Sequence, residues 1–228
     1  MTSKRDATSG ARSHDRVPYP NRSQRAAHPR HLETVATLFG MTPAPAPRCK
    51  VLELGCATGS NLIAQAYDLA EGRFLGIDLS GLQIAEARKR VQSLGLKNIE
   101  LRHADITDVG PTWGQFDYII CDAVYSWTSA EVQDTIMRIC RTNLAPNGVA
   151  FVSYNVQPGW HFRVTIRDML LYHVSHLEEP QDRIDQARAI VQFLAESCQD
   201  AACKDELRSV SQLSDALLFH QQFPARCF

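Results

Sequence analysis

Three carboxylates and two glycines stand where the chain could hold a small molecule. Glu53 lies inside a short apolar run that stops at Gly55, and Gly59 follows in the same stretch, VLELGCATGSN. Asp78 ends the next apolar run, in GIDLS, and Asp105 follows a third, in HADITD. Glycines let a backbone approach a ligand closely, and carboxylates accept hydrogen bonds from hydroxyl and amine groups. The pattern therefore predicts one ligand site built from three turns.

The residues between the glycines narrow the kind of ligand. A dinucleotide site needs G-x-G-x-x-G, so that a pyrophosphate can rest on a helix N-terminus. Here the turn is G-x-x-x-G with Cys56, Ala57 and Thr58 in its middle, and Glu53 would repel a pyrophosphate. A carboxylate at that place suits a nucleoside that carries a cation, such as a sulfonium or an ammonium. A nicotinamide-dependent oxidoreductase is therefore the less favoured enzyme.

Alternating apolar and helix-like runs supply the elements that would position these residues. The expected strands are 50–54, 73–77, 99–102, 116–121 and 148–154, and the helices between them are 60–70, 81–94 and 129–143. Strands separated by helices predict a parallel sheet with helices on both faces. A capping box, Thr128 with Glu131, predicts where the last of these helices begins, and APNG at 145–148 predicts its end. Only helical spacing follows, over 162–178, 181–195 and 204–219.

Composition divides the chain and limits its partners. We expect a basic arm with a proline-rich connector over 1–47, a ligand-binding core over 48–160 and a helical part over 161–228. The formal net charge is −1, with 24 Lys and Arg against 25 Asp and Glu, which argues against nucleic-acid coating or membrane-surface binding. Seven cysteines without a C-x-x-C pair, and no apolar leader or long apolar run, predict a cytoplasmic protein.

Taken together, the motifs resemble the class I S-adenosylmethionine-dependent methyltransferases over residues 48–155. ELGCATG is similar to that family's first motif, GIDLS to its ribose-binding acid, ADI to its adenine motif and FDYIICDAVYSW to its fourth-strand motif. The flanks, such as VPYP and NLAPNGVAFVSYNVQPGWHFR, resemble bacterial members that carry a so-called methyltransferase regulatory domain. The resemblance implies an α/β, Rossmann-like parallel sheet of about five visible strands with a helical C-terminal segment. It also implies S-adenosyl-L-methionine as cofactor.

The resemblance also implies which residues touch the cofactor. They are Tyr19, Glu53, Gly55, Cys56, Ala57, Gly59, Asn61, Asp78, Leu79, Asp105 and Ile106. The amino-acid part would lie near Glu53, the ribose at Asp78 and the adenine at Asp105, while Tyr19 would fold over the cofactor as a lid. For Asp105 alone a helix cap is an equally good interpretation, and for Cys56 packing is the better one. We expect no metal site.

Methyl transfer requires alignment of the acceptor with the methyl group and exclusion of water, without a covalent nucleophile. Asp122 follows the fourth strand and could accept a hydrogen bond from the cofactor's amino group or from an incoming amine. Tyr125 and Trp127 could line the acceptor pocket, although Trp127 fits a core role equally well. The expected acceptor is a protein side chain, with lysine slightly preferred, or a small molecule with a nitrogen or oxygen nucleophile. The alternative outside catalysis is a protein that binds the cofactor and signals through its helical segment.

The last residues, FPARCF, do not resemble the family, and a complete sheet of this family has more strands than the five runs found. We therefore expect a premature end of the chain. An uncovered sheet edge would then favour weak cofactor binding, marginal stability or self-association, with little turnover.

Overall fold

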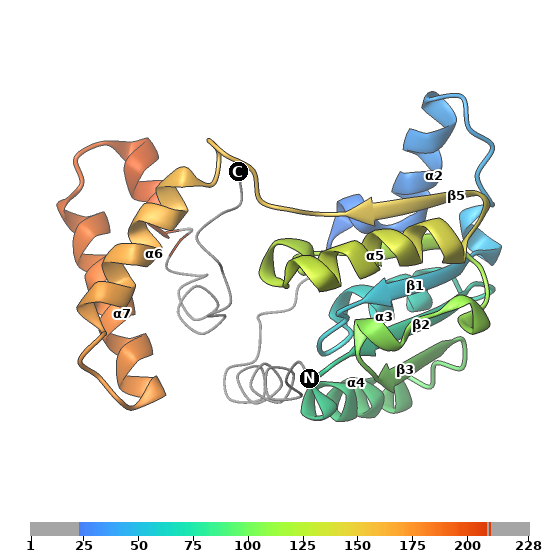
Figure 1. Cartoon of the computed structure of the whole chain (residues 1–228), viewed down its shortest axis with the longest axis horizontal. Helices are drawn as coiled ribbons and strands as arrows, with labels where there is room; N and C mark the ends of the chain where they lie inside the picture. The colour runs from blue at the N-terminus through green and yellow to red at the C-terminus, as the bar shows by residue number, and fades with distance from the viewer. Residues whose placement is uncertain (1–22, 209, 211–228) are drawn as a thin grey trace. The chain divides into compact units, whose positions relative to one another are not determined.

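The computed structural model describes residues 23–208 and 210, which fall into two compact units that join between Tyr154 and Asn155. The N-terminal unit contains a five-stranded sheet in the order β3-β2-β1-β4-β5, with all neighbouring strands parallel (Figure 1). The strands are β1 (Lys50–Leu54), β2 (Arg73–Asp78), β3 (Ile99–His103), β4 (Phe116–Cys121) and β5 (Leu144–Val152). This arrangement confirms the predicted Rossmann-like α/β fold.

Helices connect the strands as the alternation predicted. In the N-terminal unit they are α2 (Pro29–Leu38), α3 (Ser60–Asp68), α4 (Gly81–Ser93) and α5 (Ala130–Asn143). Short 3-10 turns are η1 (Arg25–Ala27), η2 (Ala46–Arg48), η3 (Ile106–Asp108), η4 (Pro111–Trp113) and η5 (Tyr125–Trp127). The direction of the strand order reverses at β1, because β2 lies on one side of it and β4 on the other. Ligands of open parallel sheets bind at such a reversal, beyond the carboxyl ends of the strands.

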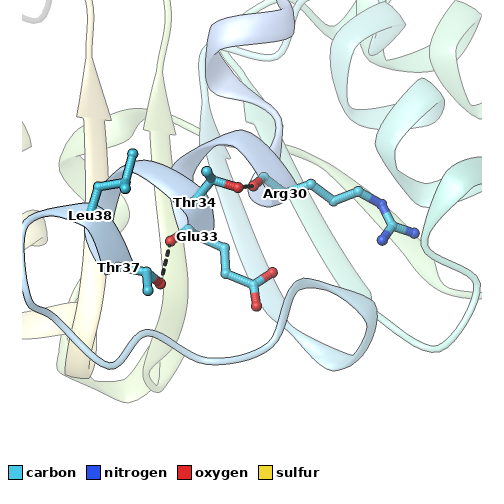
Figure 2. A pocket seen from close by; sticks show the side chains of 5 residues that line it. All are labelled: Arg30, Glu33, Thr34, Thr37 and Leu38. Atoms are coloured by element: carbon cyan, nitrogen blue, oxygen red, sulfur yellow. Dashed lines mark hydrogen bonds between the residues drawn. The ribbon is translucent and has the colours of Figure 1, made fainter.

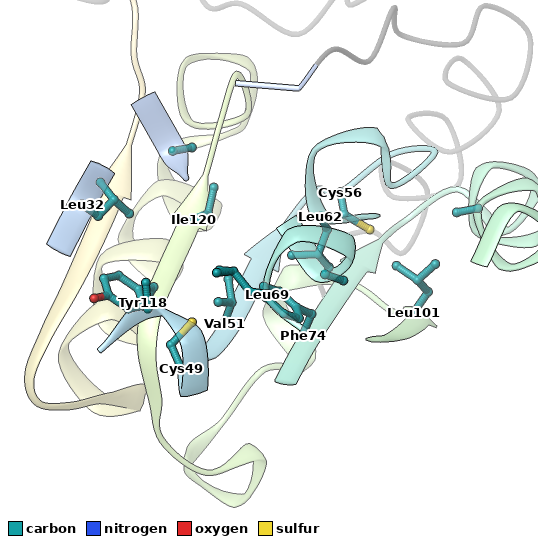
Figure 3. Close-up of a cluster of buried hydrophobic side chains, with 14 of the residues drawn as sticks. Leu32, Cys49, Val51, Cys56, Leu62, Leu69, Phe74, Leu101, Tyr118 and Ile120 are labelled. Atoms are coloured by element: carbon teal, nitrogen blue, oxygen red, sulfur yellow. The ribbon is translucent and has the colours of Figure 1, made fainter. Parts of the chain in front are cut away.

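Two clusters of buried apolar side chains hold the sheet between its helices. On one face Val51 and Tyr118 pack with side chains of α2, α3 and α4, including Leu32, Leu62 and Ile84, and Figure 3 shows most of this cluster. The other face buries the alternate strand residues against α5; its members include Leu52, Leu54, Ile77, Ile119, Ile136 and Ile139. The alternation along β1 puts Glu53 on the same face as Val51, which is the face that α3 covers.

The start of α5 differs from the sequence prediction by one residue. Ser129, not Thr128, is the N-cap, and its hydroxyl accepts the backbone N–H of Val132. The hydroxyl of Thr128 is already used, because it donates to the carbonyl of Tyr125 at 3.0 Å. The capping box of Thr128 with Glu131 was therefore wrong, although the helix begins where the pattern indicated.

The largest difference lies in β5, which begins at Leu144 rather than at residue 148. The APNG segment was expected to end α5, but α5 ends at Asn143 and the strand follows without a loop. Leu144 pairs with Phe116 and Val149 with Tyr118, so three extra residues of β5 form an irregular bulge. Asn147 adopts a left-handed φ of 62°, which Asn tolerates better than most residues. APNG thus contains a residue in a turn-like conformation, as its composition indicates, but the segment lies inside β5 and not after α5.

The C-terminal unit is helical in the part of the chain that the structure describes. Its helices α6 (His161–His173) and α7 (Pro180–Ser197) pack against each other, and a further helical stretch covers 201–208. Buried Leu170 and Val191 lie on these helices. The first helix ends at His173, five residues before the predicted end at 178, and most of the predicted 204–219 helix lies outside the described residues. No helix among those described is both long and apolar enough to span a membrane.

Candidate cofactor and acceptor site

The turn after β1 is held in a conformation that places several residues at positive φ. Gly55, Ala57 and Gly59 have φ values of 74°, 46° and 73°. Positive φ is unusual for Ala57, which has a Cβ atom, and its backbone N–H is fixed by a 2.8 Å bond to Asp78 Oδ2. Gly59 is the N-cap of α3 and offers no side-chain cap, so backbone N–H groups begin the helix at the edge of the turn. This arrangement suits a ligand that approaches the backbone.

Gly55 is required by packing as well as by its backbone conformation. A Cβ atom at this position would lie 2.5 Å from Cγ2 of Val124, in the segment that follows β4. The turn after β1 and the segment after β4 are therefore in direct contact at the reversal point. The close approach of a ligand to Gly55 stays a prediction, since the neighbouring valine alone explains the glycine.

Asp78 ends β2 and connects two turns. Its Oδ2 accepts from Ala57, and its Oδ1 accepts from the backbone N–H of Ser80 at 2.8 Å. Each carboxylate oxygen has a second lone pair, so both can still accept a hydroxyl group. The predicted ribose contact is compatible with this geometry, and Asp78 has a structural role in addition.

Glu53 is the most unusual group in the site, because its carboxyl group is buried with 4% of the residue exposed. Its Oε1 accepts from Asn61 Nδ2 at 2.8 Å, while its Oε2 has no hydrogen-bond partner among the described residues. Burial raises the pKa of Glu53 to about 8, opposed by the Asn61 hydrogen bond and assisted by the negative charges of Asp122 and Asp78. A cation at Oε2 would make ionisation favourable.

At the end of β4, Asp122 is held by a residue that the sequence did not single out. Ser153, just beyond β5, donates from its hydroxyl to Asp122 Oδ1 at 2.7 Å and accepts the backbone N–H of Ala123 at 2.7 Å. Ala123 has a φ of 55°, which this bond fixes. A serine at the same sheet edge as the predicted acid is the signal that could have identified it.

Two tyrosines extend the site from the ends of β4 and β5. The ring of Tyr125 in η5 lies 6.1 Å from the ring of Tyr154, centroid to centroid, at an angle of 59°. Tyr154 is 62% exposed. Trp127 lies two residues further on and is half-buried, which leaves both of its interpretations open. Asp122 and Tyr125 thus occupy the same stretch after β4, as predicted.

The remaining predicted cofactor residues have roles of their own in the fold. Asp105 caps η3, since its Oδ1 accepts from the backbone N–H and the hydroxyl of Thr107. Ile106 is half-buried against the α5 face, and the carbonyl of Leu79 accepts a hydrogen bond from Nε2 of His103 at 3.0 Å. Cys56 is buried in the core on the α3 face, and burial holds its thiol pKa well above the usual range.

Two further findings concern regions away from the strand ends. Tyr19 lies outside the described residues. A surface hollow on α2, lined by Arg30, Glu33, Thr34, Thr37 and Leu38, has its threonine hydroxyls bonded to carbonyls of the same helix (Figure 2). It does not include any of the predicted site residues. Among residues 23–208 and 210, no group of His, Cys, Asp and Glu side chains is arranged to hold a metal ion.

Comparison with known proteins gives a consistent result. A family model described as a methyltransferase domain matches residues 46–210. Uncharacterized protein RP789 of Rickettsia prowazekii is 48% identical over 81% of this chain and 33% of its own length. Uncharacterized protein RP028 of the same organism is 35% identical over 92% of this chain and 86% of its own length.

Among solved structures, PKMT2 from Rickettsia typhi in complex with AdoHcy superposes with a TM-score of 0.77. The two sequences are 36% identical, and the superposition covers 90% of this chain and 41% of PKMT2. The chain thus spans about a third of RP789 and two fifths of PKMT2.

Proposed function

The chain belongs to the S-adenosylmethionine-dependent methyltransferases, and from that premise we propose that it transfers a methyl group to a protein side chain. The observation that carries the proposal is the buried Oε2 of Glu53, which lies beside the glycine turn without a partner among the described residues. Burial raises the pKa of Glu53 to about 8, so the free carboxyl group holds its proton, and a cationic ligand at Oε2 would stabilise the ionised form. The methionyl part of S-adenosylmethionine carries such charges.

The residues present fit this cofactor better than a dinucleotide. Asp78 has acceptor capacity for ribose hydroxyls, the turn from Gly55 to Gly59 can receive the amino-acid part, and Ile106 and Asp105 follow β3 where the adenine is expected. A pyrophosphate would face Glu53, Asp78 and Asp122 together, an arrangement of like charges that disfavours it. The similarity to PKMT2, which was solved with AdoHcy, supports the same assignment.

The cofactor supplies a methyl group on a positively charged sulfur, which an acceptor's lone pair displaces directly. The residues of this chain then need only to orient the acceptor toward the methyl group and to shield the two from water. Asp122, fixed by Ser153, can accept a hydrogen bond from an incoming amine and hold it in one orientation. Tyr125 and Tyr154 offer ring faces beside it for the rest of the acceptor.

Two observations favour a protein acceptor. The first is the similarity to PKMT2, whose name indicates a protein methyltransferase. The second is the exposure of Tyr154, because an open acceptor side admits a side chain that remains attached to a large molecule. Lysine is our preferred residue, since a carboxylate such as Asp122 pairs with its amine. A small nitrogen or oxygen nucleophile is the second candidate, and RNA ranks below both because the net charge of −1 provides no basic footprint.

We assign the predicted helical part over 161–228 to the regulatory domain that the sequence resemblance implies. If the chain binds S-adenosylmethionine without transferring its methyl group, the alternative of a cofactor-binding regulatory protein replaces the enzymatic one.

The experiment is a transfer assay with S-adenosylmethionine labelled in its methyl group. The chain is incubated with a cell lysate, and the label is then measured in the protein, RNA and small-molecule fractions. We expect it in protein, released as methyl-lysine on hydrolysis. Asp122→Asn should reduce the label while leaving cofactor affinity, measured by titration calorimetry, within a few-fold. Label found mainly in RNA would overturn the proposed acceptor.

A further inference from the structure

Asn61 joins the buried carboxylate of Glu53 to the N-terminal segment of the described chain. Its Nδ2 donates to Glu53 Oε1 at 2.8 Å, and its Oδ1 accepts the backbone N–H of Gln24 at 3.0 Å. We call Gln24–Ala27 the anchored segment. Its last residue, Ala27, is fully buried, and the carbonyl of Ala27 accepts from Gln65 Nε2 at 3.4 Å. One side chain of α3 therefore touches both the site and the anchored segment.

The orientation of the Asn61 amide is forced by its partners. A backbone N–H can only donate, so the oxygen of the amide must face Gln24 and its nitrogen must face Glu53. Asn61 is 3% exposed, so water does not readily replace either bond. The sequence resemblance implies that Asn61 touches the cofactor, and that contact stays a prediction. Its two hydrogen bonds give Asn61 a further task, which is to join Glu53 to Gln24.

The bond from Asn61 determines which carboxylate oxygen remains for a ligand. Oε1 is used, and Oε2 is buried without a partner among the described residues. The charged groups that act on Glu53 are Asp78 from β2 and Asp122 from β4, and both disfavour its ionised form, as burial does. A cation at Oε2 would stabilise the ionised form. Hydrogen bonds to a charged acceptor are shorter and stronger than neutral ones, so the bond from Asn61 would tighten.

That tightening reaches the anchored segment through the same side chain. A more firmly held Asn61 keeps its oxygen in place for Gln24, and linkage is reciprocal, so a fixed Gln24 also favours the cation-bound form of Glu53. We propose that Asn61 is a positioning residue that couples cofactor binding at Glu53 to the order of the anchored segment. This inference rests on the proposed function only for the identity of the cation.

The test uses the full chain with three variants. Asn61→Ala removes both bonds, and Asn61→Asp keeps an acceptor for Gln24 but turns a second carboxylate toward Glu53. Gln65→Met is the matched control, because it lies one turn further along α3, is equally buried, and bonds only the anchored segment. The measurements are amide hydrogen exchange of the peptide that covers Gln24–Ala27, with and without saturating S-adenosylmethionine, and the carbon-13 carboxyl titration of Glu53.

In the unchanged chain, saturating S-adenosylmethionine should slow amide exchange of the anchored segment by roughly ten-fold. A ten-fold slowing corresponds to an opening of the segment that costs about 1.4 kcal/mol more free energy with the cofactor bound. In Asn61→Ala the cofactor should no longer slow it, even at concentrations that saturate the site. In Gln65→Met exchange should be faster in the free protein, yet the slowing by cofactor should persist. Slowing that persists in Asn61→Ala would overturn the proposal.

The carboxyl titration tests the same coupling without any cofactor. Loss of the amide donor should move the midpoint of Glu53 upward in Asn61→Ala and further upward in Asn61→Asp, while Gln65→Met leaves it unchanged. A midpoint that is the same in all four proteins would overturn the positioning role. If the unchanged chain does not bind S-adenosylmethionine in calorimetry, the proposed function fails, but the titration still decides the role of Asn61.

Discussion

The two halves of the sheet edge differ in how firmly their polar groups are held. After β1 and β2, Glu53 is buried with one oxygen fixed, and both oxygens of Asp78 receive backbone N–H groups. After β4 and β5, Asp122 is fixed on one oxygen by Ser153, and the ring of Tyr154 is largely exposed. The first half is a tightly bonded frame, whereas the second is open.

This difference matches the two ligands of the proposed reaction. A cofactor is always the same molecule, so a rigid frame of short hydrogen bonds can be matched to it in advance. An acceptor that is part of a protein needs an entrance and adaptable contacts, which exposed aromatic rings provide. Substitutions in the two halves should therefore have different consequences, and four predictions test this.

The largest effect is expected at Gly55. Gly55→Ala places a Cβ atom 2.5 Å from Val124 and forces an alanine to a φ of 74°. We expect a loss of about 2–4 kcal/mol in the free energy of unfolding, from the backbone strain and the overpacking together. Urea denaturation measures it.

Gly95 provides the control for that experiment. Its φ is 66°, but a Cβ atom there would have no neighbour within 4 Å. Gly95→Ala should therefore cost only about 1 kcal/mol, the price of the left-handed conformation. The double variant Gly55→Ala with Val124→Ala should recover the steric part. Equal losses at Gly55 and Gly95 would show that the contact between the two halves contributes nothing.

The second effect concerns the frame around Asp78. Asp78→Ala removes the acceptor for the N–H groups of Ala57 and Ser80 and the expected acceptor for ribose. Affinity for S-adenosylmethionine should fall by roughly 1.5–3 kcal/mol, the value of hydrogen bonds to a charged group. Titration calorimetry measures the change. Unchanged affinity would contradict the ribose assignment and leave Asp78 with its structural role alone.

The third prediction uses the pH dependence of Glu53. Its pKa is about 8 in the folded chain against an ordinary value of 4.5, so the folded state holds the proton more strongly. Protonated Glu53 therefore contributes to the free energy of unfolding. This contribution is fully present below pH 4.5 and is lost as the pH rises through 8.

The amide that replaces the carboxyl group in the Glu53→Gln variant cannot titrate, so the free energy of unfolding of the variant should fall less between pH 4.5 and 8 than that of the unchanged chain. The two falls should differ by at least about 1 kcal/mol, because one pKa unit corresponds to about 1.4 kcal/mol. Thermal melting of both proteins without cofactor at several pH values provides the comparison. Parallel curves would mean that Glu53 ionises normally.

The smallest effect on stability is expected in the open half. Tyr154→Ala removes an exposed ring that contacts Tyr125, and the free energy of unfolding should change by less than about 1 kcal/mol. Cofactor affinity should stay within two-fold, roughly 0.4 kcal/mol. Methyl transfer to protein should fall through a raised KM for the acceptor. A large loss of cofactor affinity would place Tyr154 in the frame instead.

The sequence was sufficient for the parts of the fold that depend on local periodicity. The mainly apolar runs 50–54 and 116–121 coincide with β1 and β4, because short runs dominated by apolar residues and bounded by turn residues are typical of buried parallel strands. The start of β5 could not be predicted, since APNG has the composition of a turn and only the pairing of Leu144, just before it, with Phe116 places the segment inside a strand. The pairing register of two strands that are distant in the sequence cannot be predicted from either strand alone.

The site shows the same limit. Glu53 was identifiable because a carboxylate in an apolar strand is rare, and Asp78 because it ends a strand. Ser153 and Val124 were not, because their importance arises from contacts with Asp122 and Gly55, which are far from them in the chain. Polar residues that act through a partner become visible only when the fold brings the partner to them.

The bulge in β5 has a consequence for how this protein can change over evolutionary time. Asn143, fully buried at the end of α5, donates to the carbonyls of Gly110 and Gly114 and so fixes one end of the segment, while Ser153 fixes the other. Between them, residues 145–148 of β5 lie opposite the single residue Asp117 of β4, so this part of the strand is three residues longer than regular pairing requires. Insertions and deletions there would be absorbed by the bulge, whereas a single residue added after Val149 would turn Ser153 to the opposite face of the sheet. Natural length variation and laboratory insertion libraries should therefore concentrate in residues 145–148.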